Sequence, residues 1–138
     1  MTPPFLECVE LSLNGGILVM TLSRPGGNAM SHQFFKDWHK ALKYAQNDNA
    51  VRVLVVTGKG KFFSSGKDLQ NVMHDGFEKE MNAEMDTLQA MVDDMINFRK
   101  PMIAAVNGPA IGFGVTCLAH FDFVYAVESA TFTVPFMR

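Results

Sequence analysis

Three loops rich in glycine are the places where this chain of 138 residues could carry out chemistry. They cover residues 25–28, 64–68 and 112–114, and each follows a stretch with the pattern of a β-strand. Glycine lets the main chain turn sharply, and it lets a ligand come close to backbone N–H groups. Two N–H groups from separate loops, each at the start of a helix, could converge on one oxygen atom that gains negative charge during a reaction. Ordinary turn formation is the alternative for any one loop alone.

The same glycines do not fit a nucleotide-binding site. In a P-loop four residues separate the two glycines, whereas five residues lie between Gly60 and Gly66. Asp68 also stands where a P-loop requires the hydroxyl that holds magnesium. Gly112 and Gly114 lack the third glycine of a dinucleotide-binding fingerprint. The spacing therefore argues against a nucleotide-dependent enzyme.

The histidines, acidic residues and cysteines do not predict a second kind of site. The four histidines lie in separate segments outside the glycine loops, so no Ser/His/Asp arrangement is readable. We predict that Asp68 caps a short helix beside its loop and that Asp122 has a structural role before a strand. Cys8 and Cys117 lack metal-ligand spacing, so we expect two reduced, buried thiols and no metal site.

Strand patterns alternate with helix patterns along the chain, which predicts an α/β fold around these loops. The expected strands cover residues 7–13, 17–23, 51–57, 102–106, 123–127 and 130–134, and the expected helices cover 31–47, 77–100 and 114–120. The strand at 51–57 is almost wholly apolar, as expected for a strand buried on both faces. Methionines at helical spacing in the second helix predict core packing, and Pro101 should end that helix. Because no linker divides the chain, we expect residues 1–138 to belong to one domain.

Composition and charge exclude several classes of protein. Hydrophobic residues make up 48% and charged residues 19% of the chain, near the average for globular proteins. The net charge is −2 and no basic tract is present, which argues against nucleic-acid binding. No apolar run is long enough to span a membrane, and the first residues show no targeting signal. We therefore expect an intracellular, reducing compartment.

Taken in order, the loops resemble the signatures of the crotonase superfamily, which contains the enoyl-CoA hydratases and isomerases. Residues 22–30 are similar to the first signature of that family. Residues 53–69 and 100–114 are similar to the two segments that each supply one N–H group to an oxyanion hole. The resemblance implies a crotonase-type spiral of repeated ββα units that is truncated before the C-terminal helices. It also implies a coenzyme A thioester as substrate, with no further cofactor.

The resemblance assigns roles to individual residues. The backbone N–H groups of Lys67 and Phe113 would form the oxyanion hole, where preorganised donors are worth about 3–4 kcal/mol each. The residues expected to line the coenzyme A portion of the site are Gly26, Gly27, Asn28, Ala29, Ser64, Ser65, Gly66, Lys67, Asp68, Leu69 and Gly112. Lys61 and Lys67 are candidates for phosphate contacts, with solvated lysines as the alternative.

Two departures from the family pattern favour an isomerase over a hydratase. Hydratases of the family use two glutamates, and the matching positions here hold Thr116 and Phe136, neither of which can act as a general base. Residues 112–116 and 130–136 more closely resemble the Δ3,Δ2-enoyl-CoA isomerase branch, including its peroxisomal members. In that branch one carboxylate follows the Pro-Phe segment by several residues. That position lies beyond Arg138, so we expect this chain alone to be inactive.

The resulting expectation is an enoyl-CoA isomerase of fatty-acid β-oxidation that acts in a peroxisome-type organelle or a mitochondrion. A non-catalytic acyl-CoA binder, or a subunit of a larger crotonase assembly, is the alternative from another functional class. The family's homotrimer forms through later helices that these residues do not include.

Overall fold

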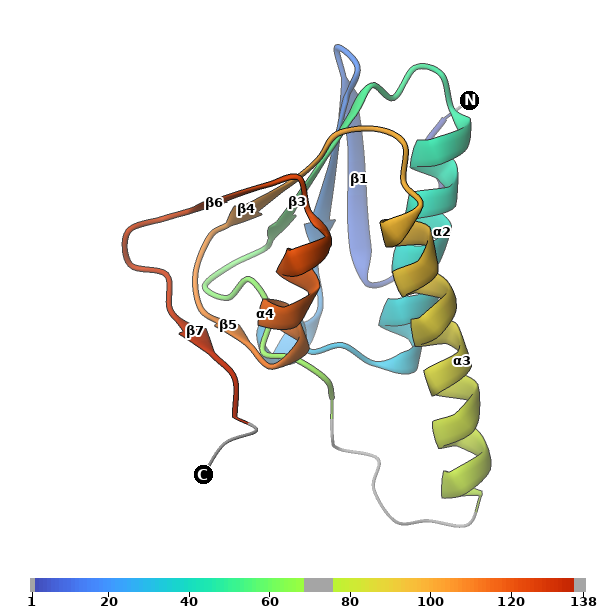
Figure 1. Cartoon of the computed structure of the whole chain (residues 1–138), viewed down its shortest axis with the longest axis vertical. Coiled ribbons are helices and arrows are strands. Elements are labelled where there is room, and N and C mark those ends of the chain that lie inside the picture. Colours follow the sequence, from blue (N-terminus) through green and yellow to red (C-terminus); the bar gives the residue numbers. More distant parts are fainter. Residues whose placement is uncertain (1, 69–75, 136–138) are drawn as a thin grey trace.

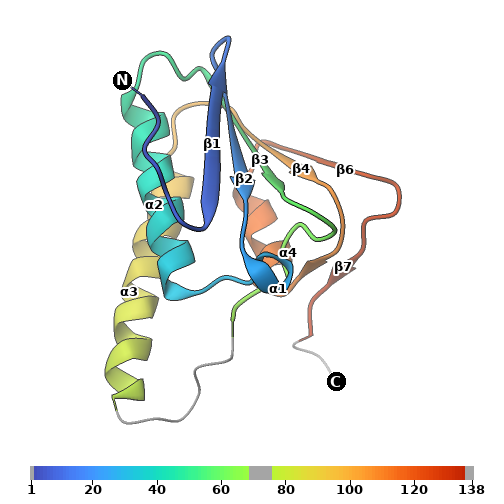
Figure 2. The same cartoon turned by 180° about the vertical axis from the view of Figure 1, so that it is seen from behind.

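The computed structural model describes residues 2–68 and 76–135, which form a mixed α/β structure (Figure 1). The main sheet contains, in order, β1 (Val9–Asn14), β2 (Ile17–Leu22), β3 (Val53–Gly58), β4 (Met102–Val106) and β6 (Phe123–Ala126). Helices α2 (His32–Asn47) and α3 (Phe77–Ile96) lie side by side along the sheet, as the two opposite views show (Figures 1 and 2). The predicted α/β fold is therefore confirmed.

The main sheet begins with a hairpin and continues with parallel strands. β1 and β2 are antiparallel, and Gly15 and Gly16 form their turn with φ angles of 60° and 84°. β2, β3, β4 and β6 then pair in parallel. β3 starts two residues later than predicted, because the N–H groups of Arg52 and Val53 both donate to the Gly16 carbonyl at 2.7 and 3.1 Å.

A second, smaller layer of parallel pairings follows the carboxyl ends of the main strands. β5 (Ala110–Ile111) pairs with β7 (Phe132–Thr133). Single bridges join Met30 to Lys67 and Ser64 to β5. Each main strand from β2 to β4 is thus followed by a short extended segment and then by a helix. This repetition agrees with the predicted ββα units, and it brings the three glycine loops into one layer.

α2 begins and ends with well-defined polar contacts. Ser31 caps its start, because the Ser31 hydroxyl accepts from the Phe34 N–H at 3.2 Å. At its end, the Lys100 ammonium donates to the carbonyl oxygens of Ala45 and Asp48 at 2.6 and 2.8 Å. These contacts fix the helix that supplies the buried Phe34, Phe35 and Trp38 side chains of the core.

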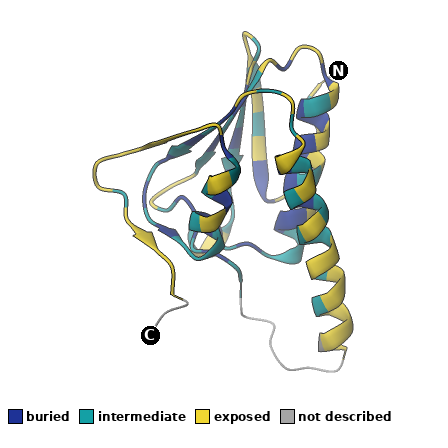
Figure 3. Ribbon diagram, in the orientation of Figure 1, coloured by how far each residue is buried: buried dark blue, intermediate teal, exposed yellow. Residues whose placement is uncertain are grey.

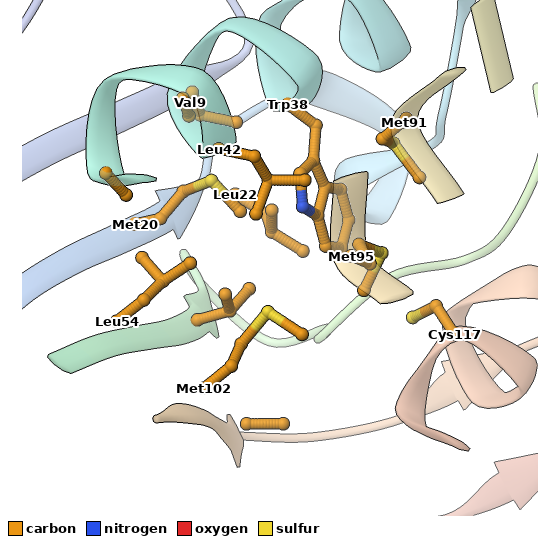
Figure 4. Packing of buried hydrophobic residues seen from close by; sticks show 14 of the residues in the cluster. Val9, Met20, Leu22, Trp38, Leu42, Leu54, Met91, Met95, Met102 and Cys117 are labelled. Atoms are coloured by element: carbon orange, nitrogen blue, oxygen red, sulfur yellow. The ribbon is translucent and has the colours of Figure 1, made fainter. Parts of the chain in front are cut away.

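The core lies between the two helices and the sheet. Figure 4 shows Trp38 and Leu42 of α2 gathered with Met91 and Met95 of α3, and all four side chains are at most 2% exposed. Because side chains buried this completely are closely packed, the core is sensitive to changes in side-chain volume.

The predicted methionine stripe of α3 is only partly buried. Met91 and Met95 belong to the core, whereas Met85 is 49% exposed. The prediction was wrong for Met85 because α2 begins beside Thr87, where His32 contacts it, so the first half of α3 extends beyond the start of α2 and few residues cover it (Figure 3). α3 also ends at Ile96, before Pro101, and the Asn97 N–H closes it by donating to the Asp93 carbonyl.

The sheet is not covered equally on its two faces. In β3, Leu54 and Val56 are fully buried, but Val53 and Val55 are only partly buried, so the predicted burial on both faces was wrong. All four residues of β6 are exposed among the residues that the structure describes (Figure 3). The last predicted strand, 130–134, is reduced to the two residues of β7. None of the described helices is both long and apolar enough for a membrane span.

Candidate functional site

The first glycine loop is a tight turn that packs directly on the second. It forms α1 (Pro25–Asn28), in which Gly26 and Gly27 take φ angles of 81° and 75°. A Cβ atom at Gly27 would lie only 3.0 Å from the Phe62 ring, so this close approach requires glycine. Asn28 ends the turn at φ 59°, in the left-handed region that asparagine tolerates better than most residues.

The side chain of Asn28 ties the first loop to the second. It is 2% exposed, and its Nδ2 lies 3.2, 3.0 and 3.2 Å from the carbonyl oxygens of Lys59, Phe62 and Phe63. Its Oδ1 accepts from the Arg24 N–H at 3.0 Å. All the hydrogen bonds of this amide are made with main-chain groups of the protein. The Asn28 side chain is therefore not available to bind coenzyme A.

In the second loop, Ser64 and Gly66 make close contacts with both other loops. The Ser64 hydroxyl donates to the Asn28 carbonyl at 2.9 Å and accepts from the Gly66 N–H at 3.0 Å. The Ser64 carbonyl accepts from the Ile111 N–H at 3.0 Å. Gly66 has φ 91°, and a Cβ atom there would lie 2.7 Å from the Ile111 carbonyl oxygen. Only glycine fits at position 66.

The third loop turns from β5 into α4 (Phe113–Thr116) at Gly112, which has φ 58°. The Gly112 N–H donates to the Thr133 carbonyl at 2.8 Å, which joins the loop to β7. α4 continues as a 3-10 helix (Cys117–His120), so the predicted helix at 114–120 is confirmed. A Cβ atom at Gly114 would lie 3.0 Å from the Ser64 carbonyl oxygen, which shows how closely α4 approaches the second loop.

The N–H groups of Lys67 and Phe113 point away from the contacts that hold their loops. In a trans peptide the N–H and the preceding C=O point in opposite directions. The Gly66 carbonyl accepts from the Met30 N–H at 2.8 Å, so the Lys67 N–H is directed away from the first loop. The Gly112 carbonyl accepts from N–H groups of the first turn of α4, so the Phe113 N–H points out of the helix start.

The N–H groups of Lys67 and Phe113 follow neighbouring glycines. A Cβ atom on Gly66 would lie 3.8 Å from the Gly112 Cα, so the glycines that precede them are adjacent. Within residues 2–68 and 76–135, neither N–H donates a hydrogen bond. The two residues that the sequence selected as oxyanion donors thus follow neighbouring glycines and keep their N–H groups available.

The charged side chains of the second loop are held by ion pairs. The Lys67 ammonium extends toward α3, where it lies 3.7 Å from Glu84 Oε1 and 3.4 Å from Met81 Sδ. Asp68 pairs with Arg24 at 2.9 Å. The segment that Asp68 was predicted to cap continues into residues 69–75, outside the described residues. Sequence reasoning missed Glu84, because no spacing rule relates a helical residue to a loop so far back along the chain.

The other residues predicted to line coenzyme A lie along the first and second loops. Ser65 joins the loops, because its N–H donates to the Gly27 carbonyl at 2.8 Å and its hydroxyl to the Gly26 carbonyl at 2.7 Å. The Ala29 carbonyl accepts from the Arg24 guanidinium at 2.8 Å. A cavity of about 210 Å³ beside the first loop is lined by Ser23, Arg24, Pro25, Asn28 and Lys59.

The sequence singled out four further positions. Leu69 and Phe136 lie outside the described residues. Thr116 is exposed on α4, and Lys61 is exposed before the second loop. A hydroxyl group therefore occupies the position where hydratases of the resembling family carry one glutamate.

The cysteines and Asp122 have structural surroundings. Both cysteines are buried free thiols, as predicted, and burial raises the pKa of Cys117 to about 12. Burial and the neighbouring Asp37 carboxylate also raise the pKa of Cys8. Asp122 accepts from the Met102 N–H at 2.8 Å, which confirms its structural role. Across the described parts of the chain, no three His, Cys, Asp or Glu side chains come together as a metal site.

Comparison with known proteins identifies the family. A family model described as enoyl-CoA hydratase/isomerase matches residues 12–138. The chain belongs to the enoyl-CoA hydratase/isomerase family. As a member, it is 45% identical over 126 residues to enoyl-CoA delta isomerase 3, peroxisomal, of Mus musculus, a match that covers 89% of this chain and 39% of the mouse protein. It is 44% identical over 131 residues to enoyl-CoA delta isomerase 2 of Rattus norvegicus, covering 93% of this chain and 33% of the rat protein.

A solved structure supports the same membership of the enoyl-CoA hydratase/isomerase family. An enoyl-CoA hydratase/isomerase family protein from Silicibacter pomeroyi superposes with a TM-score of 0.86 at 31% identity. The match covers 92% of this chain and 55% of that chain. The family resemblance inferred from three loops is confirmed, with the isomerase branch among its relatives. The chain spans less than half of the length of the mouse and rat relatives.

Proposed function

We propose that this protein binds a coenzyme A thioester and stabilises its enolate during Δ3,Δ2-enoyl-CoA isomerisation, a step of fatty-acid β-oxidation. The observation that supports this proposal is the pair of N–H groups of Lys67 and Phe113, which follow adjacent glycines and have no acceptor within the described residues. A thioester oxygen bound by both would be stabilised as it gains negative charge.

The chemistry follows from where the charge develops. Removal of a proton from the carbon alpha to the thioester converts the carbonyl into an enolate, and return of the proton at the gamma carbon moves the double bond. Main-chain donors held by glycine turns need no reorganisation at that moment, and each is worth about 3–4 kcal/mol. The proton carrier is a separate carboxylate, which the isomerase branch is expected to place after the Pro-Phe segment at 135–136.

The isomerase is favoured over a hydratase by sequence and by site chemistry. Thr116 has a hydroxyl where hydratases carry a glutamate, and a hydroxyl cannot hold a proton as a general base near neutral pH. The mouse and rat relatives are both named as delta isomerases. Because the mouse relative is named as peroxisomal, we propose a peroxisome as the compartment, with a mitochondrion as the alternative.

Proline substitution tests the oxyanion hole directly, because proline removes the N–H. We compare Lys67→Pro with Lys67→Ala and Phe113→Pro with Phe113→Ala, so that each alanine variant controls for the lost side chain. Phe113 is the first residue of α4, a position where proline is compatible with helix geometry. We expect each proline variant to bind an acyl-CoA about tenfold more weakly than its alanine partner.

Binding is measured by calorimetry, and circular dichroism establishes that each variant is folded. Equal affinities within both folded pairs would refute the assignment of these donors. Turnover is measured separately with a 3-enoyl-CoA substrate, in a form of the protein that includes the expected carboxylate. A protein that isomerises this substrate as fast in the proline variants as in the wild type would contradict the proposed role of the donors.

Exposed aromatic side chains favour a second candidate function, an acyl-CoA-binding subunit of a larger assembly. Phe123 and Tyr125 of β6 are 57% and 64% exposed, and their rings stack on each other 6.5 Å apart. Exposed apolar surface of this kind is typical of contact regions. Mass measurement in solution distinguishes the candidates, since a stable monomer that does not bind a hydrophobic dye would contradict the assembly.

A further inference from the structure

One buried residue, through its side chain and its carbonyl group, joins all three glycine loops. Ser64 is completely buried, and its hydroxyl donates to the Asn28 carbonyl of the first loop at 2.9 Å. The same hydroxyl accepts from the Gly66 N–H within its own loop at 3.0 Å. The Ser64 carbonyl accepts from the Ile111 N–H at the start of the third loop at 3.0 Å. Both hydrogen-bonding roles of this hydroxyl are therefore used inside the protein.

The Ser64 hydroxyl binds the peptide group next to the one that carries the Lys67 N–H, a proposed oxyanion donor. By accepting from the Gly66 N–H, it fixes the peptide that precedes the Gly66–Lys67 peptide. The Met30 N–H holds the Gly66 carbonyl at 2.8 Å from the other side. Because a peptide is planar, these two contacts together set the direction of the Lys67 N–H. They also occupy the Gly66 N–H, so that it does not compete for a bound oxygen.

We infer that Ser64 is a positioning residue for the oxyanion hole, and that its hydroxyl aims the Lys67 N–H at the thioester oxygen without touching the substrate. This inference rests on the proposed function, and it goes beyond it by giving a side chain a role in a site made of main-chain donors. Donors must be placed within a fraction of an ångström to stabilise developing charge, so a small shift at Gly66 matters.

Loss of the hydroxyl should loosen the second loop. In Ser64→Ala the Gly66 N–H would keep its buried place without an acceptor, and the Asn28 carbonyl would lose a donor. Buried unpaired polar groups are unfavourable, so the loop would shift to find other partners. The Cβ atom stays in place, so the packing of Ser64 against Gly114 is retained.

The vibrational frequency of the bound thioester carbonyl measures this effect directly. Butyryl-CoA labelled with carbon-13 at the thioester carbon is bound to the full chain, and the carbonyl stretch is recorded by isotope-edited infrared difference spectroscopy. Hydrogen bonds from an oxyanion hole polarise the carbonyl and lower its frequency. The matched control is Thr57→Val, which removes a hydroxyl that donates to the Ala105 carbonyl at 2.8 Å in the main sheet.

We expect a clear lowering of the frequency in the wild type and in Thr57→Val. In Ser64→Ala we expect this shift to fall to about half or less, while the dissociation constant changes by less than about threefold. If Ser64→Ala does not fold or bind, Ser64→Cys takes its place, since the longer bonds and weak hydrogen bonding of sulfur should reduce the shift in the same direction.

The outcomes distinguish the positioning role of Ser64 from the oxyanion hole itself. A wild-type shift that is unchanged in Ser64→Ala, or in Ser64→Cys where alanine fails, overturns the positioning role and leaves the oxyanion hole standing. A thioester that binds the wild type without any shift refutes the oxyanion hole and the proposed function with it. An equal loss of shift in Thr57→Val would also contradict a specific role for Ser64.

Discussion

Replacement of Asn28 should be the most destabilising polar substitution in the glycine loops. The Asn28 amide is buried, it reaches three carbonyl oxygens of residues 59–63 just before the second loop, and its own oxygen accepts from the Arg24 N–H. Alanine removes all of these contacts and leaves main-chain groups without partners. It also places a residue less suited than asparagine at a φ angle of 59°.

The size of the effect follows from these two causes. Each buried polar group left unpaired costs about 1–3 kcal/mol, and the left-handed backbone conformation costs alanine about 1–2 kcal/mol. Water can reach some of the freed carbonyl groups, because Lys59 is exposed. We therefore expect Asn28→Ala to lower the free energy of unfolding by about 3–5 kcal/mol. Asn28→Gly should lose about 1 kcal/mol less, because glycine adopts positive φ freely.

Urea unfolding followed by circular dichroism measures these differences. The matched control is Asn97→Ala, since Asn97 also donates from its side-chain amide to a carbonyl, that of Asp93 at 2.9 Å, but does so on the surface. We expect the control to lose less than about 1 kcal/mol. A loss below about 1 kcal/mol in Asn28→Ala would refute the reasoning that this amide holds the two loops together.

Three further predictions concern other parts of the chain. Lys100→Met removes two charge-assisted hydrogen bonds from the end of α2, so it should lower the free energy of unfolding by about 1–3 kcal/mol. Urea unfolding measures this loss, and an unchanged free energy would contradict the capping role of Lys100. The Ala50 N–H holds the pKa of Asp48 below its ordinary value, so Asp48 stabilises the fold above its unfolded pKa and loses this contribution as the pH falls. The difference in melting temperature between the wild type and Asp48→Asn should therefore shrink between about pH 5 and pH 2, and a constant difference would argue against it. Cys117, with a pKa of about 12, should react with a thiol reagent at pH 8 only when the protein unfolds, and rapid native labelling would show that it is accessible.

Local patterns in the sequence were enough to predict the α/β fold, the start of α2 near Ser31 and the family. Ser31 and the apolar stretches can be recognised locally, because the start of a helix and a buried strand are each specified by residues that are close together in the sequence. The glycine loops were also recognisable, since positive φ angles and close backbone approach leave few alternatives to glycine.

What the sequence could not predict depends on contacts between distant segments. The ion pair between Asp68 and Arg24 joins two residues that are far apart in the sequence. Glu84 has no local feature that relates it to Lys67. The exposure of Met85 likewise depends on where α2 begins rather than on the spacing within α3. Periodicity describes one face of a helix, whereas burial depends on the neighbour that covers it.

The contacts that the second glycine loop makes with the other two have a consequence for the order of folding. Asn28 and its partner Phe63 are 35 residues apart, and Ser64 must also meet Ile111 of the following unit. Such non-local contacts are completed late, because a long stretch of chain must be ordered first. A nascent chain that has not yet formed β5 would therefore have no place for a thioester. Acyl-CoA binding during synthesis would report the moment at which the third unit docks.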